Sequence, residues 1–191
     1  MPDSPEGRLI VISGPSGVGK TSIVEAVLAR TNARFSVSAT TREPRPGEVQ
    51  GVDYTFLTPA AFRAMRDRGD ILEWATYGGH FYGTPRAAVL PIIETGTDVV
   101  LDIENEGARQ IRDAYPDALM IFIRPPTLHH LAERLARRGD TSPSDIDKRL
   151  AVADEQIVEA GALYDHIVTN DDLATTITEV LDILRQPRRT P

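Results

Sequence analysis

The sequence predicts an α/β fold built on a parallel β-sheet, on three observations. Apolar runs of strand length recur at 8–13, 98–103 and 118–123, and such unbroken runs are typical of strands buried on both faces of a parallel sheet. Segments with helical spacing of apolar residues separate these runs. Alternating strands and helices favour parallel pairing, because each helix returns the chain across one face of the sheet. The chain of 191 residues is long enough for one domain with its own core and small inserted subdomains.

The first strand, expected at 8–13, leads into a glycine-rich loop and then a helix. The loop fits the P-loop template of Gly, four residues, Gly-Lys and then Ser or Thr. Its residues are Ser13, Gly14, Pro15, Ser16, Gly17, Val18, Gly19, Lys20 and Thr21. Glycines let successive N–H groups converge on phosphate oxygens, and the positive end of the following helix adds to the attraction. We therefore predict a nucleotide phosphate site, in which Lys20 reaches the β- and γ-phosphates and Thr21 binds Mg²⁺.

The segment from 34 to about 83 has a different pattern. Short strand candidates occupy 35–38, 54–57 and 71–74. Between the last two, a short helix is expected, with Thr58 as its N-cap, Pro59 in its first turn and Gly69 at its end. Short strands joined by tight turns indicate an inserted β-rich subdomain.

The second half returns to alternating elements. Thr84 and Pro85 are expected to open a helix that closes at Gly96. After the strand at 98–103, the remaining elements are expected as a helix at 108–114, a strand at 118–123, a helix at 128–138, a loop at 139–144, a helix ending at Gly161, a strand at 166–169 and a helix at 172–185. The last helix is expected to turn one apolar face inward, formed by Leu173, Ile177, Val180 and Leu184.

Composition excludes several classes of protein. The net charge of −7 argues against nucleic acid as a partner, because duplex affinity comes largely from basic residues. The chain has no cysteine, which excludes disulfides and thiolate metal sites and agrees with a reducing cytosol. Its N-terminal apolar run is far shorter than the ~20 residues of a membrane span. We expect a cytoplasmic protein with no membrane and no nucleic-acid partner.

Arginines fall into two groups that suit phosphoryl transfer, because the planar guanidinium grips phosphate oxygens in pairs. Arg42 and Arg45 lie on a charged, proline-stiffened loop, where they could hold an acceptor phosphate. A second group flanks the loop at 139–144 and could close over the donor: Arg134, Arg138 and Arg149. Taken one at a time, each also fits a solvated surface arginine.

Hydroxyl and carboxyl side chains suggest the acceptor. Guanine offers two adjacent donors, N1–H and the 2-amino group, so a guanine site needs an acidic acceptor beside a hydroxyl. Glu73 and Glu104 could supply the acid, and Ser38 and Thr84 the hydroxyl; Glu73 alone fits a solvent-facing strand residue equally well. Asp102, at the carboxyl end of a buried strand, could hold the Mg²⁺ water shell. Two tyrosines, Tyr54 and Tyr82, could donate hydrogen bonds to the acceptor phosphate. Each could equally be a buried ring whose hydroxyl contacts solvent.

Together these segments resemble the bacterial guanylate kinases along nearly the whole chain. The segment Thr40-Thr41-Arg42-Glu43-Pro44-Arg45-Pro46-Gly47-Glu48 is far more specific to that family than the P-loop. The other matching segments are 14–21, 36–39, 51–54, 72–75, 81–84, 134–139 and 167–172. The resemblance implies a P-loop NTPase fold of three α/β/α layers with a parallel central sheet. It also implies a core at 8–33, 84–127 and 151–186, a GMP-binding insert at about 34–83 and a helical lid at about 128–150.

The resemblance also implies roles for individual residues. ATP would be bound by Gly14 to Thr21, Arg134, Arg138 and Asn170, the last near the adenine. GMP would be bound by Ser38, Arg42, Arg45, Tyr54, Glu73, Tyr82, Thr84 and Glu104. Phosphoryl transfer would be catalysed by Lys20, Arg42, Arg138 and Arg149 with Mg²⁺, which Thr21 and Asp102 would hold.

The chain departs from the family pattern at two positions. Glu104 replaces an aspartate that helps to read the guanine, and its arm is longer. Glu106 replaces a neutral glutamine, and its added negative charge could weaken nucleotide binding or alter Mg²⁺ placement.

The leading hypothesis is an enzyme that transfers a phosphoryl group from ATP to GMP, giving ADP and GDP. No general base is required, because the GMP phosphate is already an anion. The alternatives are a guanylate-kinase-like interaction module that has lost catalysis, and another P-loop small-molecule kinase. Use of dGMP, and the choice between monomer and homo-oligomer, stay open.

Overall fold

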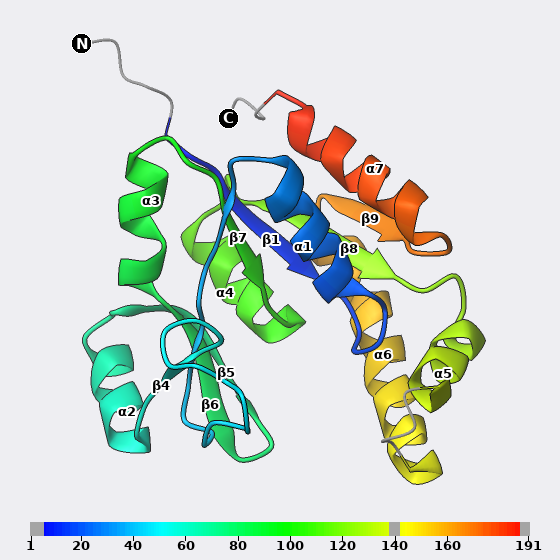
Figure 1. The fold of residues 1–191 in the computed structure, drawn as a ribbon, viewed down its shortest axis with the longest axis horizontal. Helices are drawn as coiled ribbons and strands as arrows, with labels where there is room; N and C mark the ends of the chain where they lie inside the picture. Colours follow the sequence, from blue (N-terminus) through cyan, green and yellow to red (C-terminus); the bar gives the residue numbers. More distant parts are fainter. Residues whose placement is uncertain (1–5, 138–141, 188–191) are drawn as a thin grey trace. The chain divides into compact units, whose positions relative to one another are not determined.

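The computed structural model of the chain describes residues 6–137 and 142–187. Figure 1 labels its helices and strands, and the chain divides into two compact units. Unit 1 comprises Met1–Leu9, Ala33–Leu101 and Glu106–Ala118. Unit 2 comprises Ile10–Asn32, Asp102–Asn105 and Leu119–Pro191.

Unit 2 is built on parallel strands. Strand β1 (Leu9–Ser13) pairs with β8 (Leu119–Arg124), and β8 pairs with β9 (His166–Thr169), both in parallel. All five residues of β1 are buried, as the unbroken apolar run predicts. The helices of this unit are α1 (Lys20–Arg30), α5 (Leu128–Arg137), α6 (Pro143–Leu163) and α7 (Leu173–Arg185).

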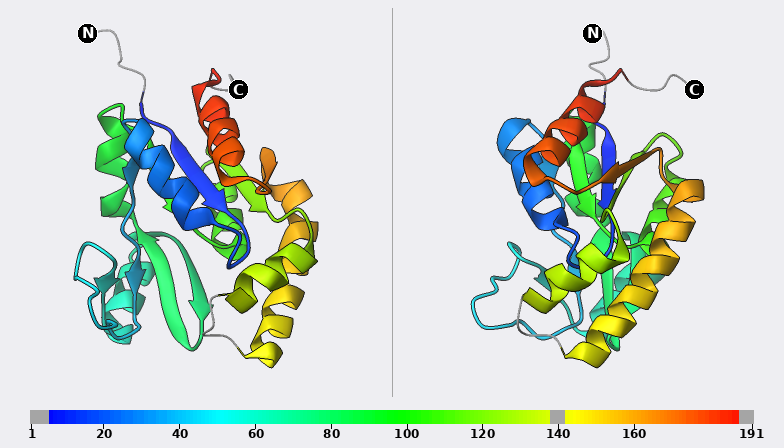
Figure 2. Two further views of the ribbon diagram at one scale, coloured as in Figure 1. Left: turned by 45° about the vertical axis from the view of Figure 1, so that its right-hand side comes forward. Right: turned by 90° about the vertical axis from the view of Figure 1, so that its right-hand side faces the viewer.

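The helices of unit 2 pack in two pairs, which both views of Figure 2 show side by side. Helix α1 packs against α7, and α5 packs against α6. The contact between α5 and α6 is a small apolar cluster built from Leu131, Leu135 and Ala153, with Leu128, Ile146 and Leu150 packed against it.

Unit 1 holds a second sheet of four short strands. Its order is β4 (Thr55–Phe56), β3 (Ala39–Thr40), β6 (His80–Pro85) and β5 (Ile71–Tyr77). Strand β2 (Arg34–Phe35) pairs in parallel with β7 (Val99–Asp102). The helices are α2 (Pro59–Asp67), α3 (Leu90–Glu94) and α4 (Asn105–Ala114), with a 3₁₀ turn at Arg86–Ala88. The residues from 34 to 83 are thus β-rich, as expected.

Helix α2 confirms the capping signals read from the sequence. The Thr58 hydroxyl accepts a hydrogen bond from the Ala61 backbone N–H at 3.2 Å, and Pro59 occupies the first helical position. Phe62 is fully buried, and Gly69 follows the helix with a φ of 77°.

The expected helix start at Thr84 is wrong. Strand β6 continues to Pro85, because β5 pairs with it antiparallel as far as Ile71 opposite Pro85. Proline is tolerated there because β3 pairs with β6 only at Tyr82 and Gly83, so Pro85 lies beyond that ladder. The expected strand at 35–38 is also too long: β2 ends at Phe35 and β3 begins at Ala39.

The last helix largely follows its predicted pattern. Ile177, Val180 and Leu184 are buried. Leu173, the first residue of the helix, is by contrast 40% exposed. Within residues 6–137 and 142–187, no helix combines the length and the apolar character that crossing a membrane requires.

Candidate active site

The P-loop of unit 2 has a backbone that requires glycine. Gly14 and Gly19 have φ angles of 147° and 102°, which other residues rarely adopt. Space is equally tight, since a Cβ at Gly14 would lie 2.1 Å from the Ile123 carbonyl oxygen. Helix α1 begins at Lys20 without a side-chain cap, so no side chain at its N-cap competes with a phosphate for its first N–H groups. The predicted phosphate cradle thus has the required strand, loop and helix.

Asn170 is hydrogen-bonded to the P-loop. It is 4% exposed, and its Nδ2 donates a hydrogen bond to the Val18 carbonyl oxygen at 2.7 Å. Its Oδ1 accepts from the Thr176 hydroxyl at 3.1 Å. Arg134 donates to the Val18 carbonyl at 3.3 Å and to the Asn170 carbonyl at 2.9 Å. Both predicted ATP-site residues therefore contact the loop itself, whereas sequence reasoning did not find Thr176.

Lys20 and Asp102 form an ion pair. The Lys20 Nζ lies 3.0 Å from Asp102 Oδ1, with the two side chains 13% and 27% exposed. The Thr21 side chain is exposed in the first turn of α1. A hydroxyl and a carboxylate are oxygen donors of the kind that Mg²⁺ takes alongside water and substrate phosphates. The part of the chain that the structure describes holds no group of three or more His, Cys, Asp or Glu side chains that could bind a metal ion.

The two other predicted lid arginines are placed differently. Arg138 lies outside the described residues. Arg149 lies on α6 and is half-buried.

Glu104 and Asn105 are attached to α6. The Gln156 side-chain amide donates to the Glu104 carboxylate. Asn105 is buried, and its Nδ2 donates to the Gln156 carbonyl at 3.2 Å and to Glu159 Oε2 at 3.0 Å. The Tyr164 hydroxyl donates to Asn105 Oδ1 at 2.8 Å. The position of the predicted guanine contact Glu104 is therefore set by α6, which no local sequence signal indicated.

In unit 1, Arg42 lies at the centre of a charged and aromatic cluster. Its guanidinium donates to both carboxylate oxygens of Glu48, at 2.9 and 2.8 Å, and Glu48 also accepts from the Arg45 backbone N–H at 2.7 Å. The bonds with Glu48 raise the pKa of Arg42, and a hydrogen bond with Tyr82 raises it further. The same bonds from Arg42 and Arg45 hold the pKa of Glu48 below its usual range.

Aromatic rings complete this cluster. The Arg42 guanidinium lies 5.4 Å from the Tyr54 ring centroid, and the Tyr54 and Tyr82 rings meet edge-on at 6.1 Å. The structure thus brings together Arg42, Tyr54 and Tyr82, three of the predicted GMP-phosphate ligands. The side chain of Arg45 is exposed, and Ser38 is half-buried just before β3.

Glu73 and Thr84 form a buried pair between β5 and β6. Glu73 is 4% exposed, which overturns its interpretation as a solvent-facing strand residue. The Thr84 hydroxyl donates to Glu73 Oε1 at 2.6 Å. Burial raises the pKa of Glu73 to about 7, the Thr84 bonds oppose this rise, and the negative charge of Glu106 adds to it. The acceptor and hydroxyl expected of a guanine site therefore lie side by side.

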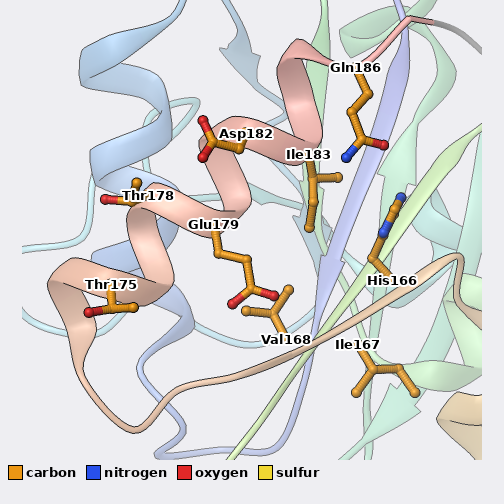
Figure 3. A pocket seen from close by; sticks show the side chains of 9 residues that line it. All are labelled: His166, Ile167, Val168, Thr175, Thr178, Glu179, Asp182, Ile183 and Gln186. Carbon is orange, nitrogen blue, oxygen red and sulfur yellow. The ribbon is translucent and has the colours of Figure 1, made fainter.

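An open cavity of about 620 Å³ lies between β9 and α7 (Figure 3). Figure 3 shows Glu179 and Asp182 on α7, with His166 on β9 near Gln186. Among the described residues, none of those predicted to bind nucleotide lines this cavity. It is therefore separate from the candidate site.

Comparisons with known proteins identify the family of the chain. The sequence model of the family described as Guanylate kinase matches residues 6–187. The chain is 48% identical over 185 residues to a guanylate kinase of Symbiobacterium thermophilum, with 96% of this chain and 87% of that protein covered. It is 49% identical over 181 residues to a guanylate kinase of Gloeobacter violaceus, with 94% and 88% covered.

A solved structure is similar as well. The crystal structure of guanylate kinase from Anaplasma phagocytophilum has a TM-score of 0.76 and 32% identity, covering 97% of this chain and 88% of that one. This likeness confirms the predicted α/β fold of the P-loop NTPase type, with a parallel central sheet flanked by helices. The P-loop, the cluster around Arg42 and these matches over nearly the full length lead to one conclusion: the chain belongs to the guanylate kinase family.

Proposed function

We propose that this protein transfers the γ-phosphoryl group of ATP to GMP, giving ADP and GDP, with Mg²⁺ and as a step of purine nucleotide metabolism. The observation that carries the proposal is the buried pair of Glu73 and Thr84, in a chain of the guanylate kinase family. An ionised carboxylate accepts hydrogen bonds from guanine N1–H and the 2-amino group. Adenine presents an acceptor at N1, which would face the carboxylate unfavourably. The pair therefore favours GMP over AMP.

The remaining predicted residues divide between the two nucleotides. In this proposal Arg42, Tyr54 and Tyr82 bind the GMP phosphate together with Arg45, and Ser38 and Glu104 add guanine contacts. The P-loop residues 14–21, Arg134 and Asn170 bind ATP. The proximity of Arg42 to both tyrosines, and of Asn170 to Val18, supports this division.

Catalysis in this proposal depends on position and charge, not on a base. Lys20 neutralises the β- and γ-phosphates, and Arg42, Arg138 and Arg149 stabilise charge on the transferred group. Thr21 and Asp102 would hold Mg²⁺, which when bound supplies positive charge to the phosphates. The GMP phosphate needs no deprotonation by the protein because it is already anionic.

A coupled assay of ADP release tests the proposal. The purified protein is given Mg-ATP and, in turn, GMP, dGMP, AMP, CMP or UMP. GMP should be the preferred acceptor, and K20A should abolish turnover while its circular dichroism stays that of the wild type. ADP release with none of the acceptors would favour an interaction module that has lost catalysis. Preference for another acceptor would identify a different small-molecule kinase.

The proposal extends to organisation and location. A core, a GMP-binding insert at about 34–83 and a lid at about 128–150 would move together when both nucleotides bind. Because ATP and GMP are cytoplasmic metabolites, the proposed location is the cytoplasm, which cell fractionation tests.

A further inference from the structure

Gly107 lies against the Glu73 carboxylate. It belongs to the first turn of α4 and is buried. A Cβ placed on it would lie 2.1 Å from Glu73 Oε2, 2.9 Å from Cδ and 3.4 Å from Cγ. The three atoms nearest to that Cβ therefore all belong to the side chain of Glu73, the residue predicted to bind guanine.

The backbone does not explain this glycine. Gly107 is absent from the glycines with positive φ, so alanine could adopt its helical conformation. Glycine inside a helix is less favourable than alanine by about 1 kcal/mol. Gly107 therefore weakens the first turn of α4. In exchange, its missing side chain leaves space beside Glu73.

Two other glycines show what is particular to this position. A Cβ on Gly161, in α6, would have no heavy atom within 4 Å. A Cβ on Gly83, in β6, would lie 2.6 Å from the Glu73 carbonyl oxygen, which is backbone and cannot move without disturbing the sheet. At Gly107 the obstacle is instead the end of a flexible side chain, so the side chain would move and the fold would remain.

We propose that Gly107 is a positioning residue for guanine specificity. Its missing side chain lets Glu73 hold its carboxylate beside Thr84, 2.6 Å from the hydroxyl. A methyl group at 107 displaces that carboxylate, and the displacement separates it from both Thr84 and the guanine edge. The inference rests on the proposed function, because it assumes that Glu73 reads guanine.

The first experiment compares G107A with G161A, the same substitution in another helix. G107A should lower kcat/KM for GMP by at least about tenfold, because small displacements in a site have effects of this size. Its KM for ATP should stay within about twofold of wild type, and its preference for GMP over AMP should fall. G161A should match the wild type in all three measurements. Full retention of GMP preference in G107A would overturn the inference.

A second experiment uses stability and does not depend on turnover. Urea unfolding is measured for the wild type, G107A, E73A and the double variant. If the methyl group meets only Glu73, G107A should lose stability in the wild-type background and lose none in the E73A background. The inference would be refuted if G107A lowered stability by the same amount in the E73A background as in the wild type. It would also be refuted if both G107A and the G107A/E73A double variant failed to fold. Either result would mean that the methyl group clashes with backbone and not with Glu73.

These outcomes separate the inference from the proposed function. A wild-type protein that does not phosphorylate GMP refutes the proposed function, whatever the urea data show. A wild-type protein that prefers GMP, with a G107A variant that behaves like G161A, refutes only the inference.

Discussion

At the scale of single residues, the buried Glu73 carboxyl links the predicted specificity to pH. Its pKa is raised from 4.5 to about 7, so the folded protein binds this proton more tightly than the unfolded chain. Stability is therefore greatest below the unfolded pKa and falls as pH rises through about 7. A shift of this size corresponds to about 3 kcal/mol.

We predict that E73Q removes this dependence. Relative to the wild type, the free energy of unfolding of E73Q should rise between pH 5 and pH 8, because glutamine has no charge to bury. The gain at pH 8 should be up to about 3 kcal/mol. Urea denaturation at both pH values measures it. An equal difference at pH 5 and pH 8 would contradict the raised pKa.

Glu106, one of the two residues that depart from the family pattern, affects the Glu73 carboxyl. Its negative charge raises the pKa of Glu73. We predict that E106Q lowers that pKa, so that kcat/KM for GMP reaches its plateau at a lower pH. D113N, which removes one charge near the far end of the same helix, is the control and should leave the profile in place. Identical pH profiles for E106Q and the wild type would argue against this influence.

At the scale of elements, the P-loop depends on Asn170. Its side-chain amide joins Val18 to Thr176, and Asn170 lies 152 residues from Val18 in the chain. We predict that N170A lowers the free energy of unfolding by about 0.5–1.5 kcal/mol, because it removes the 2.7 Å hydrogen bond to the Val18 carbonyl and leaves only the longer bond from Arg134. Its KM for ATP should rise several-fold while its KM for GMP changes little. Steady-state kinetics against N32A, an exposed asparagine after α1, measures this.

The sequence predicted those helices and strands whose signals are local and mispredicted those that depend on contacts with distant segments. The buried runs identified β1, β7 and β8, and the cap at Thr58 identified α2, because these signals are local. Thr84 was misassigned, because its strand depends on pairing with β5, which the local Thr-Pro signal does not contain. For the same reason the sequence could suggest Glu73 and Thr84 separately but not their hydrogen bond. The attachment of Asn105 to α6 was missed entirely, since it joins segments far apart in the chain.

At the scale of the whole molecule, the predicted ligands divide almost completely between the two units. The predicted GMP ligands lie in unit 1, with Glu104 as the exception, and the P-loop and Asn170 lie in unit 2. We predict that GMP slows hydrogen exchange mainly within residues 33–101. A non-hydrolysable ATP analogue should slow it mainly within residues 10–32 and around Asn170. Exchange followed by mass spectrometry measures both, and protection by GMP confined to unit 2 would contradict the assignment.

The ion pair of Arg42 with Glu48 has a consequence for how an acceptor is admitted. Glu48 accepts hydrogen bonds from the guanidinium with both carboxylate oxygens, which is the two-point contact that a phosphate would also make. With a net charge of −7, the molecule as a whole offers little long-range attraction to a nucleotide. If Arg42 binds the acceptor phosphate, as we propose, entry of the acceptor would exchange one anion for another at this guanidinium. In this proposal a dianionic phosphate would compete with Glu48 for the guanidinium, whereas guanosine, which has no phosphate, would leave the Arg42–Glu48 pair intact.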